Sequence, residues 1–243
     1  MSLSRFHLAP NVWREDALVL TGDEAIHCAR VQRHQVGDFV EIGDGVGRVA
    51  VAEITAITKS EVHLRVEALR RHDPLPYRIH LLPALIKAEP FEWLLEKSVE
   101  LGAASVRPIF TERTVVHLAG EQMDKKLAKW RRLMIESAKQ CHTPFLPELR
   151  LPQPLSQALE HTPSDALKVL PALTESIRSV KELLVRPIRE VYAMIGPEGD
   201  FSPQEELLAR EHGFEPVTLG PLVLRAETAA VALLTILGHE LRS

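Results

Sequence analysis

The sequence, 243 residues long, predicts a C-terminal α/β domain with a largely parallel sheet, preceded by a small β-rich domain. Residues 38–69 alternate apolar and polar side chains between Gly-Asp-Gly and Lys-Ser turn signals, which is typical of a β-meander or small barrel. From Tyr77 onward, strand-like apolar stretches alternate with stretches of helical periodicity, which is typical of α/β domains. Between them lies Arg-Arg-His-Asp-Pro-Leu-Pro, whose X-Pro pairs favour an extended linker. We therefore expect domains at residues 1–72 and 75–243.

The composition is ordinary for a globular protein. Hydrophobic residues make up 45% and charged residues 26% of the chain, and the net charge is −4, which excludes a protein that simply coats a polyanion. Cys28 and Cys141 are too few for a disulfide framework, and the eleven histidines are scattered, so we expect free thiols and no metal site. With no signal peptide and no run of about 20 apolar residues, we expect a soluble cytoplasmic protein without membrane contact.

Local spacing predicts the elements in order. Residues 23–34 form a short helical or loop segment that brings Arg30, Arg33 and His34 together. The helix at residues 90–101 begins with Pro90 in its first turn and ends before a glycine. A long helix is expected at residues 124–140, and strands at residues 77–86, 104–110, 166–173, 191–195 and 215–220.

Residues 123–139 are strongly basic for an acidic protein. They hold six Lys and Arg against two Asp and Glu, a local charge of +4. A solvated helix face explains this pattern as well as a surface that contacts RNA phosphates does. Residues 1–74 hold nine Lys and Arg and eleven Asp and Glu, so an RNA contact there would be a patch.

A glycine-containing loop, Gly-Pro-Glu-Gly at residues 196–199, follows the strand at residues 191–195. Ser202 and Glu205 then form a capping box around Pro203, which predicts the start of a helix. In an open α/β sheet, loops at the carboxyl ends of strands form the ligand crevice. The pattern is therefore that of either a binding loop or a tight turn.

The ligand of this loop is not expected to be a phosphate. The loop is neither G-x-G-x-x-G nor a P-loop, Pro197 lacks a backbone donor, and Glu198 adds negative charge. A neutral or cationic ligand such as S-adenosylmethionine, with its positive sulfonium, fits better. From this loop alone, the favoured interpretation is a tight turn whose Glu198 simply meets an arginine.

Residues 219–234, LGPLVLRAETAAVALL, repeat the pattern of strand, glycine turn and helix. The two loops should lie near each other at one sheet edge, where Arg225 and Glu198 could meet as a partly buried pair. The helix expected at residues 228–241 is apolar on nearly every face, so it is buried inside the domain or against a second subunit.

These motifs resemble a known family. IGPEGDFSPQE and LGPLVLRAETAA closely resemble the paired motifs of the RsmE family, SPOUT-superfamily methyltransferases of bacterial 16S rRNA. HCARVQRHQVGDFVEIGDG resembles the family's N-terminal signature, and EWLLEKSVELGAASVRPIF and the segment KWRRLMIESAKQC with its following LPEL resemble its central segments. The five matches occur in order along the whole chain.

The resemblance implies a fold and a reaction. The expected fold is an N-terminal PUA-like β-barrel that binds RNA, followed by a SPOUT α/β domain with a deep trefoil knot at about residues 168–243. The expected reaction is methyl transfer from S-adenosyl-L-methionine to N3 of the uridine conventionally numbered 1498, in the decoding region of 16S rRNA. The expected partners are the 30S ribosomal subunit and a second copy of the chain, packed through the knot.

The resemblance also implies site residues. Arg225 is the expected catalyst, with Glu198 and Glu227 as candidate general bases. Cofactor contacts are expected from three loops, comprising Leu170, Pro171, Leu173, Ile195, Gly196, Pro197, Glu198, Gly199, Leu219, Gly220, Leu222, Leu224, Ala226 and Thr228. RNA contacts are expected from Arg5, Arg30, Arg33, Lys87, Lys125, Lys126, Lys129 and Arg132.

Three positions depart from the family pattern. Asp200 stands where relatives commonly have glycine, and Pro90 stands where a basic residue is frequent, although Lys87 is kept. The segment at residues 140–143, Gln-Cys-His-Thr, lacks the usual arginine, for which Lys139 or His142 could substitute.

Other interpretations stay open at this point. Glu227 could complement the charge of a helix N-terminus, and Thr228 could be a helix cap. The enzyme could act on a ribose 2′-hydroxyl or another rRNA base, or the chain could be an RNA-binding assembly factor without activity. A nucleotide-dependent hydrolase or dehydrogenase is disfavoured, because both phosphate-binding glycine motifs are missing.

Overall fold

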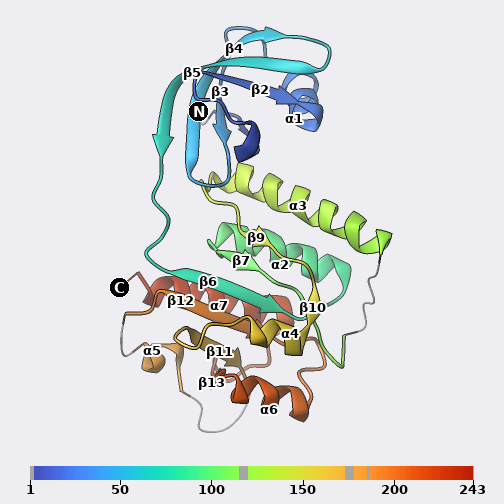
Figure 1. The fold of residues 1–243 in the computed structure, drawn as a ribbon, viewed down its shortest axis with the longest axis vertical. Helices are drawn as coiled ribbons and strands as arrows, with labels where there is room; N and C mark the ends of the chain where they lie inside the picture. Colours follow the sequence, from blue (N-terminus) through green and yellow to red (C-terminus); the bar gives the residue numbers. More distant parts are fainter. Residues whose placement is uncertain (1–2, 115–119, 173–177, 185–186, 243) are drawn as a thin grey trace. The chain divides into compact units, whose positions relative to one another are not determined.

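The computed structural model describes residues 3–114, 120–172, 178–184 and 187–242. The chain divides into two compact units (Figure 1). The N-terminal unit comprises Met1–Pro74 and Ile135–Leu146, and the C-terminal unit comprises Leu75–Met134 and Pro147–Ser243. The division after Pro74 lies close to the expected boundary, but residues 135–146 count with the N-terminal unit.

The N-terminal unit is built on a five-stranded sheet in the order β1-β3-β4-β5-β2. The β1–β3 pair is parallel and the other pairs are antiparallel. Within the described residues the ladder ends at β1 and β2, so the sheet is a half-barrel. Its elements are β1 (Arg5–His7), β2 (Ala17–Thr21), β3 (Phe39–Gly43), β4 (Arg48–Ile57), β5 (Glu61–Arg71), a 3₁₀ turn (Pro10–Val12), α1 (Gly22–Ile26) and a π-helical turn (His27–Val31).

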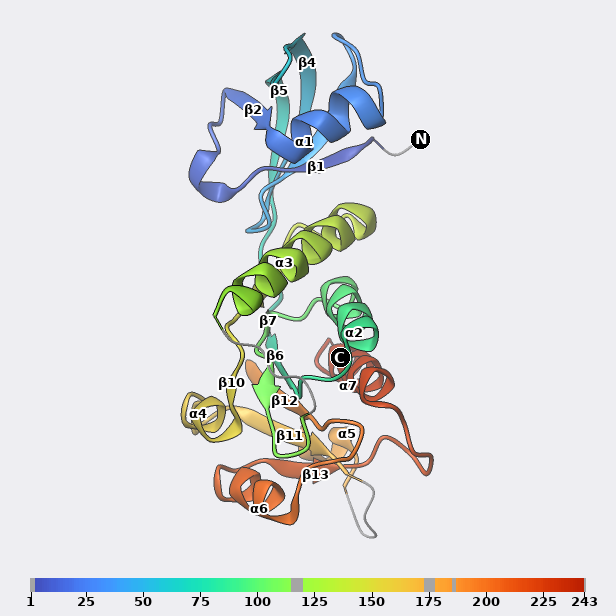
Figure 2. The ribbon, with the colours of Figure 1, turned by 90° about the vertical axis from the view of Figure 1, so that its right-hand side faces the viewer.

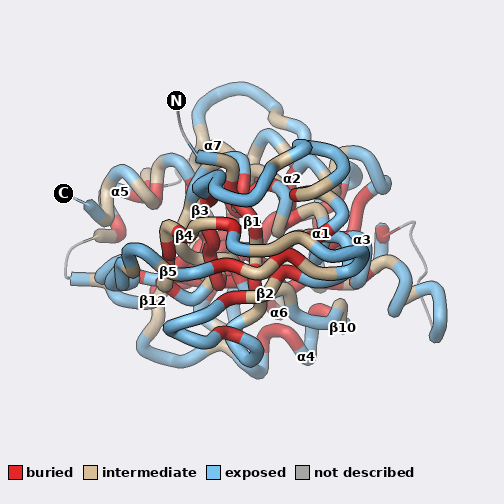
Figure 3. Tube along the Cα trace, turned by 90° about the horizontal axis from the view of Figure 1, so that it is seen from above, coloured by how far each residue is buried: buried red, intermediate tan, exposed pale blue. Residues whose placement is uncertain are grey.

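Period-2 alternation explains this sheet. Along β2 the burial pattern is exposed, buried, intermediate, buried, exposed, and Figure 3 shows buried positions separated by exposed ones along the strands. Successive side chains of a strand point to opposite faces, so one face builds the core. That core includes Phe6, Leu20, Ile42 and Ile54, all fully buried.

The C-terminal unit has a six-stranded sheet in the order β13-β11-β12-β6-β7-β9, with every pair parallel. The predicted alternation of strands and helices is therefore confirmed. A short parallel pair joins β8 and β10. The strands are β6 (Arg78–Pro83), β7 (Ser105–Val106), β8 (Ile109–Phe110), β9 (Glu148–Leu149), β10 (Gln153–Pro154), β11 (Leu167–Pro171), β12 (Glu190–Ile195) and β13 (Glu215–Val217).

Helices cover both faces of this parallel sheet (Figure 2). On one face α7 packs against β6, β12 and α2, and on the other α4 packs against α6 over a core that includes Met194 and Phe214. The helices of this unit are α2 (Ala88–Glu100), α4 (Leu155–Glu160), α5 (Val180–Leu183), α6 (Pro203–Glu211) and α7 (Ala226–Glu240). α3 (Glu121–Cys141) begins in this unit, and its residues from Ile135 onward belong to the N-terminal unit.

The predicted helix signals act as expected. At the start of α6, the Glu205 amide donates to Ser202 Oγ at 3.4 Å, and the Ser202 amide donates to Glu205 Oε2 at 2.9 Å, which completes the capping box. Pro90 lies in the first turn of α2, and Gly102 follows the helix with φ of 72°. Only glycine adopts such a left-handed φ without steric cost.

A buried polar group lies within the C-terminal sheet. The parallel register places His80 between Ser105 and Tyr192 on neighbouring strands. His80 Nδ1 lies 2.7 Å from Ser105 Oγ, His80 Nε2 lies 2.6 Å from Glu190 Oε2, and the imidazole stacks on the Tyr192 ring at 4.6 Å. These contacts satisfy both ring nitrogens of a histidine that is only 7% exposed.

His80 should make the stability of the C-terminal unit pH-dependent. Burial lowers the pKa of His80, although Glu190 opposes the shift. The pKa of His80 is therefore lower in the folded state than the value of about 6.5 in the unfolded state. Its contribution to stability is fully present above the unfolded-state pKa, where the ring is neutral in both states. The contribution is lost as the pH falls through the folded-state pKa. We expect the thermal unfolding midpoint to decrease between pH 7 and pH 5 in the wild type, and to decrease less in His80→Leu. Equal pH slopes in His80→Leu, the wild type and the exposed control His72→Leu would contradict this.

Candidate functional site

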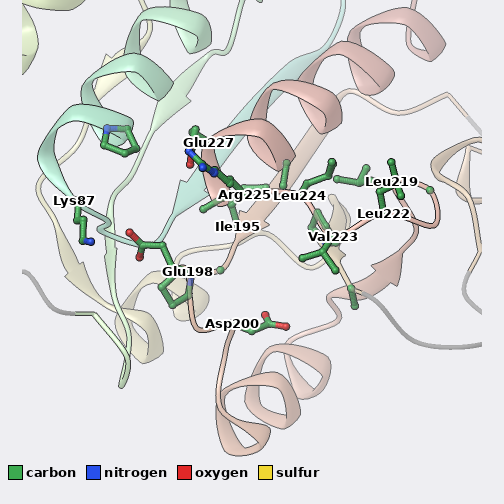
Figure 4. Close-up of a pocket in the computed structure, with 18 residues that line it drawn as sticks. Lys87, Ile195, Glu198, Asp200, Leu219, Leu222, Val223, Leu224, Arg225 and Glu227 are labelled. Atoms are coloured by element: carbon green, nitrogen blue, oxygen red, sulfur yellow. The ribbon is translucent and has the colours of Figure 1, made fainter.

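The C-terminal unit contains a cavity of about 550 Å³ at the carboxyl edge of its sheet. Three loops and the first turns of two helices form its wall (Figure 4). The lining residues are Lys87, Pro90, Pro171, Ala172, Ile195, Gly196, Pro197, Glu198, Asp200, Leu219, Gly220, Leu222, Val223, Leu224, Arg225, Ala226, Glu227 and Ala229.

The loops meet because the strands that carry them are parallel. The first loop follows β11, the second follows β12, and the third follows β13. In the sheet β11 lies between the other two strands, so the two glycine-containing loops are not from adjacent strands. Their carboxyl ends still reach one edge of the sheet, which brings the two predicted loops to a single cavity.

Two helices begin at this cavity, each with a cation at its N-cap. Lys87 is the N-cap residue of α2 and Arg225 is that of α7, and neither helix has a side-chain hydrogen bond at its cap. Glu227 lies in the first turn of α7, where its carboxylate complements the positive end of the helix dipole. The helix thus begins two residues before the expected start, so Thr228 lies inside its first turn and is not the cap.

The expected buried pair of Arg225 and Glu198 is absent. Both residues are exposed, and the described part of the chain contains no ion pair between them. In Figure 4, Glu198 extends toward Lys87, whereas the Arg225 guanidinium lies beside Glu227. The two groups line the same cavity separately because they come from loops on non-adjacent strands.

The second loop has a geometry that explains two of its residues. A Cβ on Gly196 would lie 3.1 Å from Asp200 Oδ1 and 3.2 Å from the Phe201 ring, so this position favours glycine. Asp200 has φ of 64°, the left-handed region in which aspartate is tolerated better than most residues. Its Oδ1 accepts a hydrogen bond from the Phe201 amide at 2.9 Å.

Three of the described residues expected to contact a cofactor, Leu170, Gly199 and Thr228, do not line the cavity. Leu170 is 2% exposed and packs in the core with Met194, because alternate residues of β11 face opposite sides of the sheet. Gly199 packs against Arg113, and Thr228 is exposed on another side of α7. Leu173 lies outside the described residues.

Three lining residues lie outside the loops expected at the site: Pro90, Asp200 and Ala229. Ala172 and Val223 belong to the expected loops at residues 170–173 and 219–226. Helical spacing could have found two of the three, because Pro90 lies three residues after Lys87 and Ala229 lies four residues after Arg225. Asp200 was recognised only as a departure from the family pattern. Its approach to the cavity depends on the left-handed turn, which composition does not reveal.

The residues expected to contact RNA are not equally accessible. Arg5 is 7% exposed, its Nε lies 3.4 Å from Glu41, and burial lowers its pKa, so Arg5 is structural and we no longer count it as an RNA contact. Arg30, Arg33, Lys87, Lys125, Lys129 and Arg132 are exposed and Lys126 is half-buried. Lys129 Nζ donates to Glu92 Oε1 at 2.6 Å, so the basic face of α3 is partly neutralised.

Neither expected substitute for the missing arginine is free. Lys139 is 8% exposed, and its Nζ donates to Glu24 at 2.9 Å and to Glu136 at 2.8 Å within the N-terminal unit. His142 Nδ1 lies 3.1 Å from Glu41 Oε1. The two side chains join residues 135–146 to α1 and to β3 of the N-terminal unit.

Comparison with known proteins identifies the family. A model described as an RNA methyltransferase domain matches residues 73–238, and one described as an RNA methyltransferase PUA domain matches residues 20–67. The protein named Ribosomal RNA small subunit methyltransferase E in Mycobacterium bovis is 30% identical over 226 residues, which cover 90% of this chain and 85% of that protein. The chain belongs to the RsmE family of RNA methyltransferases.

Solved RsmE-like structures have the same fold. A Legionella pneumophila methyltransferase in complex with the cofactor S-adenosylmethionine is 32% identical, with a TM-score of 0.90 and 98% of each chain covered. The Ribosomal RNA small subunit methyltransferase E of Neisseria gonorrhoeae, bound to S-adenosylmethionine, is 26% identical, with a TM-score of 0.88 and coverage of 98% of this chain and 97% of that chain.

The described residues contain neither a helix suited to span a membrane nor a cluster suited to bind a metal ion. No described helix combines the length and the apolar character that crossing a membrane requires. Among the residues that the structure describes, no group of three or more His, Cys, Asp or Glu side chains is arranged to hold a metal ion.

The left-handed turn at Asp200 should tolerate some substitutions and not others. We expect Asp200→Asn to leave the free energy of unfolding nearly unchanged, because asparagine keeps the Oδ1 acceptor and tolerates positive φ. Asp200→Val should lower that free energy by about 1–3 kcal/mol, because a β-branched residue is strained there. Urea unfolding would measure both, and equal stability of the two variants would contradict the strain argument.

Proposed function

We propose that this protein transfers a methyl group from S-adenosylmethionine to N3 of the uridine conventionally numbered 1498 in bacterial 16S rRNA. One observation carries the proposal: three loops from neighbouring strand ends line a single cavity, in a chain whose fold matches two proteins solved with S-adenosylmethionine. The relatives named as small-subunit rRNA methyltransferases support the RNA substrate.

The cavity suits this cofactor chemically. Its volume of about 550 Å³ lies within the range of about 300–1,000 Å³ that small-molecule sites occupy. Ile195, Leu222 and Leu224 offer apolar surface for an adenine ring, and Glu198 and Asp200 offer negative charge to a sulfonium. Pro197 removes an amide that a phosphate would use, so a ligand without phosphates is favoured.

Three charged residues of the cavity have distinct roles in the proposed methyl transfer. S-adenosylmethionine supplies an electrophilic methyl carbon when bound. Uracil N3 must lose its proton before it attacks, and the Arg225 guanidinium stabilises the negative charge that develops on the uracil oxygens. Glu198 or Glu227 accepts the N3 proton. Because Glu227 also complements the helix dipole, Glu198 is the more available of the two.

The exposed cations supply the RNA contacts in this proposal. Arg30 and Arg33 lie on the N-terminal unit, and Lys125, Lys129 and Arg132 lie on α3, all accessible to phosphates. Lys87 lines the cavity itself, where it suits a phosphate of the target nucleotide. The target base must leave its stack to enter the cavity. A ribosomal substrate fits a cytoplasmic enzyme.

We also propose that residues 168–243 form the deep trefoil knot of the SPOUT superfamily and that the protein is a homodimer packed through that region. Leu222 and Val223 are 72% and 81% exposed at the rim of the cavity. Apolar side chains of this size at a site rim suit a surface that a partner covers. α7 also carries half-buried apolar residues, such as Val231 and Ile236, that suit burial against a partner.

The test is to map the product. The protein would be incubated with labelled S-adenosylmethionine and 30S subunits that lack the modification, and the labelled nucleotide identified by mass spectrometry. We expect 3-methyluridine at position 1498. A label on a ribose 2′-hydroxyl or on another base would overturn the substrate assignment, and cofactor binding without methyl transfer would favour an assembly factor.

Removal of Arg225 should separate catalysis from cofactor binding. We expect Arg225→Ala to lower the methylation rate by about 100-fold or more, because a preorganised cation is lost. Calorimetry should find the affinity for S-adenosylmethionine nearly unchanged, and Arg210→Ala, an exposed arginine of α6, should behave as the wild type. A variant that methylates normally would remove Arg225 from catalysis, and one that loses cofactor affinity would give it a structural role.

A further inference from the structure

The loop at residues 196–202 places Glu198 at the cavity. Contacts on the outer side of the loop, which faces away from the cavity, must therefore fix the position of Glu198. The Asp200 amide donates to the Pro197 carbonyl at 2.9 Å, which closes a turn within the loop. The other contacts of the outer side come from a turn between β8 and α3, residues 111–114. This turn belongs to the same unit as the loop.

Arg113 is the central residue of these contacts. Its Nη1 donates a hydrogen bond to the Gly199 carbonyl and a longer one, 3.4 Å, to the Phe201 carbonyl. A Cβ on Gly199 would lie only 3.3 Å from Arg113 Cδ, so the arginine stem packs directly over the glycine. No carboxylate within the described residues forms an ion pair with Arg113. The guanidinium is therefore committed to the backbone of the loop.

The turn that carries Arg113 is itself well held. The Thr111 amide donates to Thr114 Oγ1 at 2.9 Å, the two threonine hydroxyl oxygens lie 2.9 Å apart, and the Thr114 amide donates to the Thr111 carbonyl at 3.1 Å. Thr114 is 8% exposed. Hydroxyl groups that satisfy nearby backbone groups fix a turn without further packing.

Glu205 joins the turn to the start of α6. Its Oε2 accepts from the Ser202 amide at 2.9 Å as part of the capping box, and its Oε1 accepts from the Glu112 amide at 2.8 Å. One carboxylate thus holds the end of the loop and the turn beside it. Arg113 does not line the cavity, so its influence there passes through the loop.

We propose that Arg113 is a positioning residue for the cofactor, because it fixes the Gly199 and Phe201 carbonyls and thereby the path of the loop that brings Glu198 to the cavity. The inference rests on the proposed function for the identity of the cofactor. Charge-assisted hydrogen bonds are the strong ones among protein hydrogen bonds, and here one acts on the Gly199 carbonyl while a longer, weaker one reaches the Phe201 carbonyl. The competing role is an RNA contact through the exposed part of the guanidinium.

The test compares Arg113→Ala and Arg113→Lys with the matched control Arg210→Ala. We expect Arg113→Ala to raise the Kd and the KM for S-adenosylmethionine about tenfold, since charge-assisted bonds to the loop are lost. Arg113→Lys keeps one cationic donor and should recover part of the affinity, and millimolar guanidinium should partly rescue Arg113→Ala. A residue needed only for folding would lower the unfolding midpoint without such rescue.

A second readout needs no cofactor. In Arg113→Ala the amides of Asp200, Phe201 and Ser202 should exchange hydrogen for deuterium faster than in Arg210→Ala, because the loop opens more often. If the wild type does not bind S-adenosylmethionine but this exchange difference appears, the proposed function fails and the loop-positioning role stands. An unchanged exchange rate in Arg113→Ala overturns the inference. Unchanged cofactor affinity together with a raised KM for 30S subunits also overturns it, because Arg113 would then be an RNA contact.

Discussion

The parallel pairing of β11, β12 and β13 is the constraint on which the rest of the C-terminal unit depends. Because all three strands run in one direction, their carboxyl ends share an edge, and the loops that leave them must meet there. The two glycine-containing loops are 20 or so residues apart in the chain and lie on strands that do not touch, yet they line one cavity. In the N-terminal sheet only the β1–β3 pair is parallel, so the carboxyl ends of the described strands do not gather at one edge in this way.

The charges of the cavity follow from this geometry. Lys87 and Arg225 stand at the N-caps of two helices that pack against each other, so two cations are brought to one side of the site. Cations are unfavourable at helix N-termini, since the dipole is positive there. Such a placement costs local stability and is compensated elsewhere, which is typical of residues kept for function. Glu198 and Asp200 balance them from the opposite loop.

Local sequence signals predicted most of the fold. The capping box of Ser202 and Glu205, the proline in the first turn of α2 and the glycine after it each depend on neighbours within a few residues, and each is present in the structure. Period-2 alternation likewise predicted the N-terminal sheet. The short strands β7 and β8 were expected as one strand, but Arg107 and Pro108 separate them and the two strands pair with different neighbours.

The sequence did not predict the contacts between segments that are distant in the chain. A partly buried Arg225–Glu198 pair was one possibility, because a charge near a core needs a partner, but both residues are exposed to solvent and need none. Leu170 was expected at the site, but the side of β11 on which it lies faces the core. Lys139 and His142 were expected to be available, and the contacts of residues 135–146 with Glu24 and Glu41 engage them.

By itself, the sequence determined the class of fold, the family and the two loops that carry chemistry, because periodicity, caps and motifs are local properties of the chain. Only the tertiary structure decided which side chains of those loops face the cavity and what holds them there. Arg113 has no distinguishing local pattern, and its contact with Gly199 joins residues 86 positions apart. Such a contact depends on strand order and on the turn at Asp200, and these depend on the packing of the whole unit.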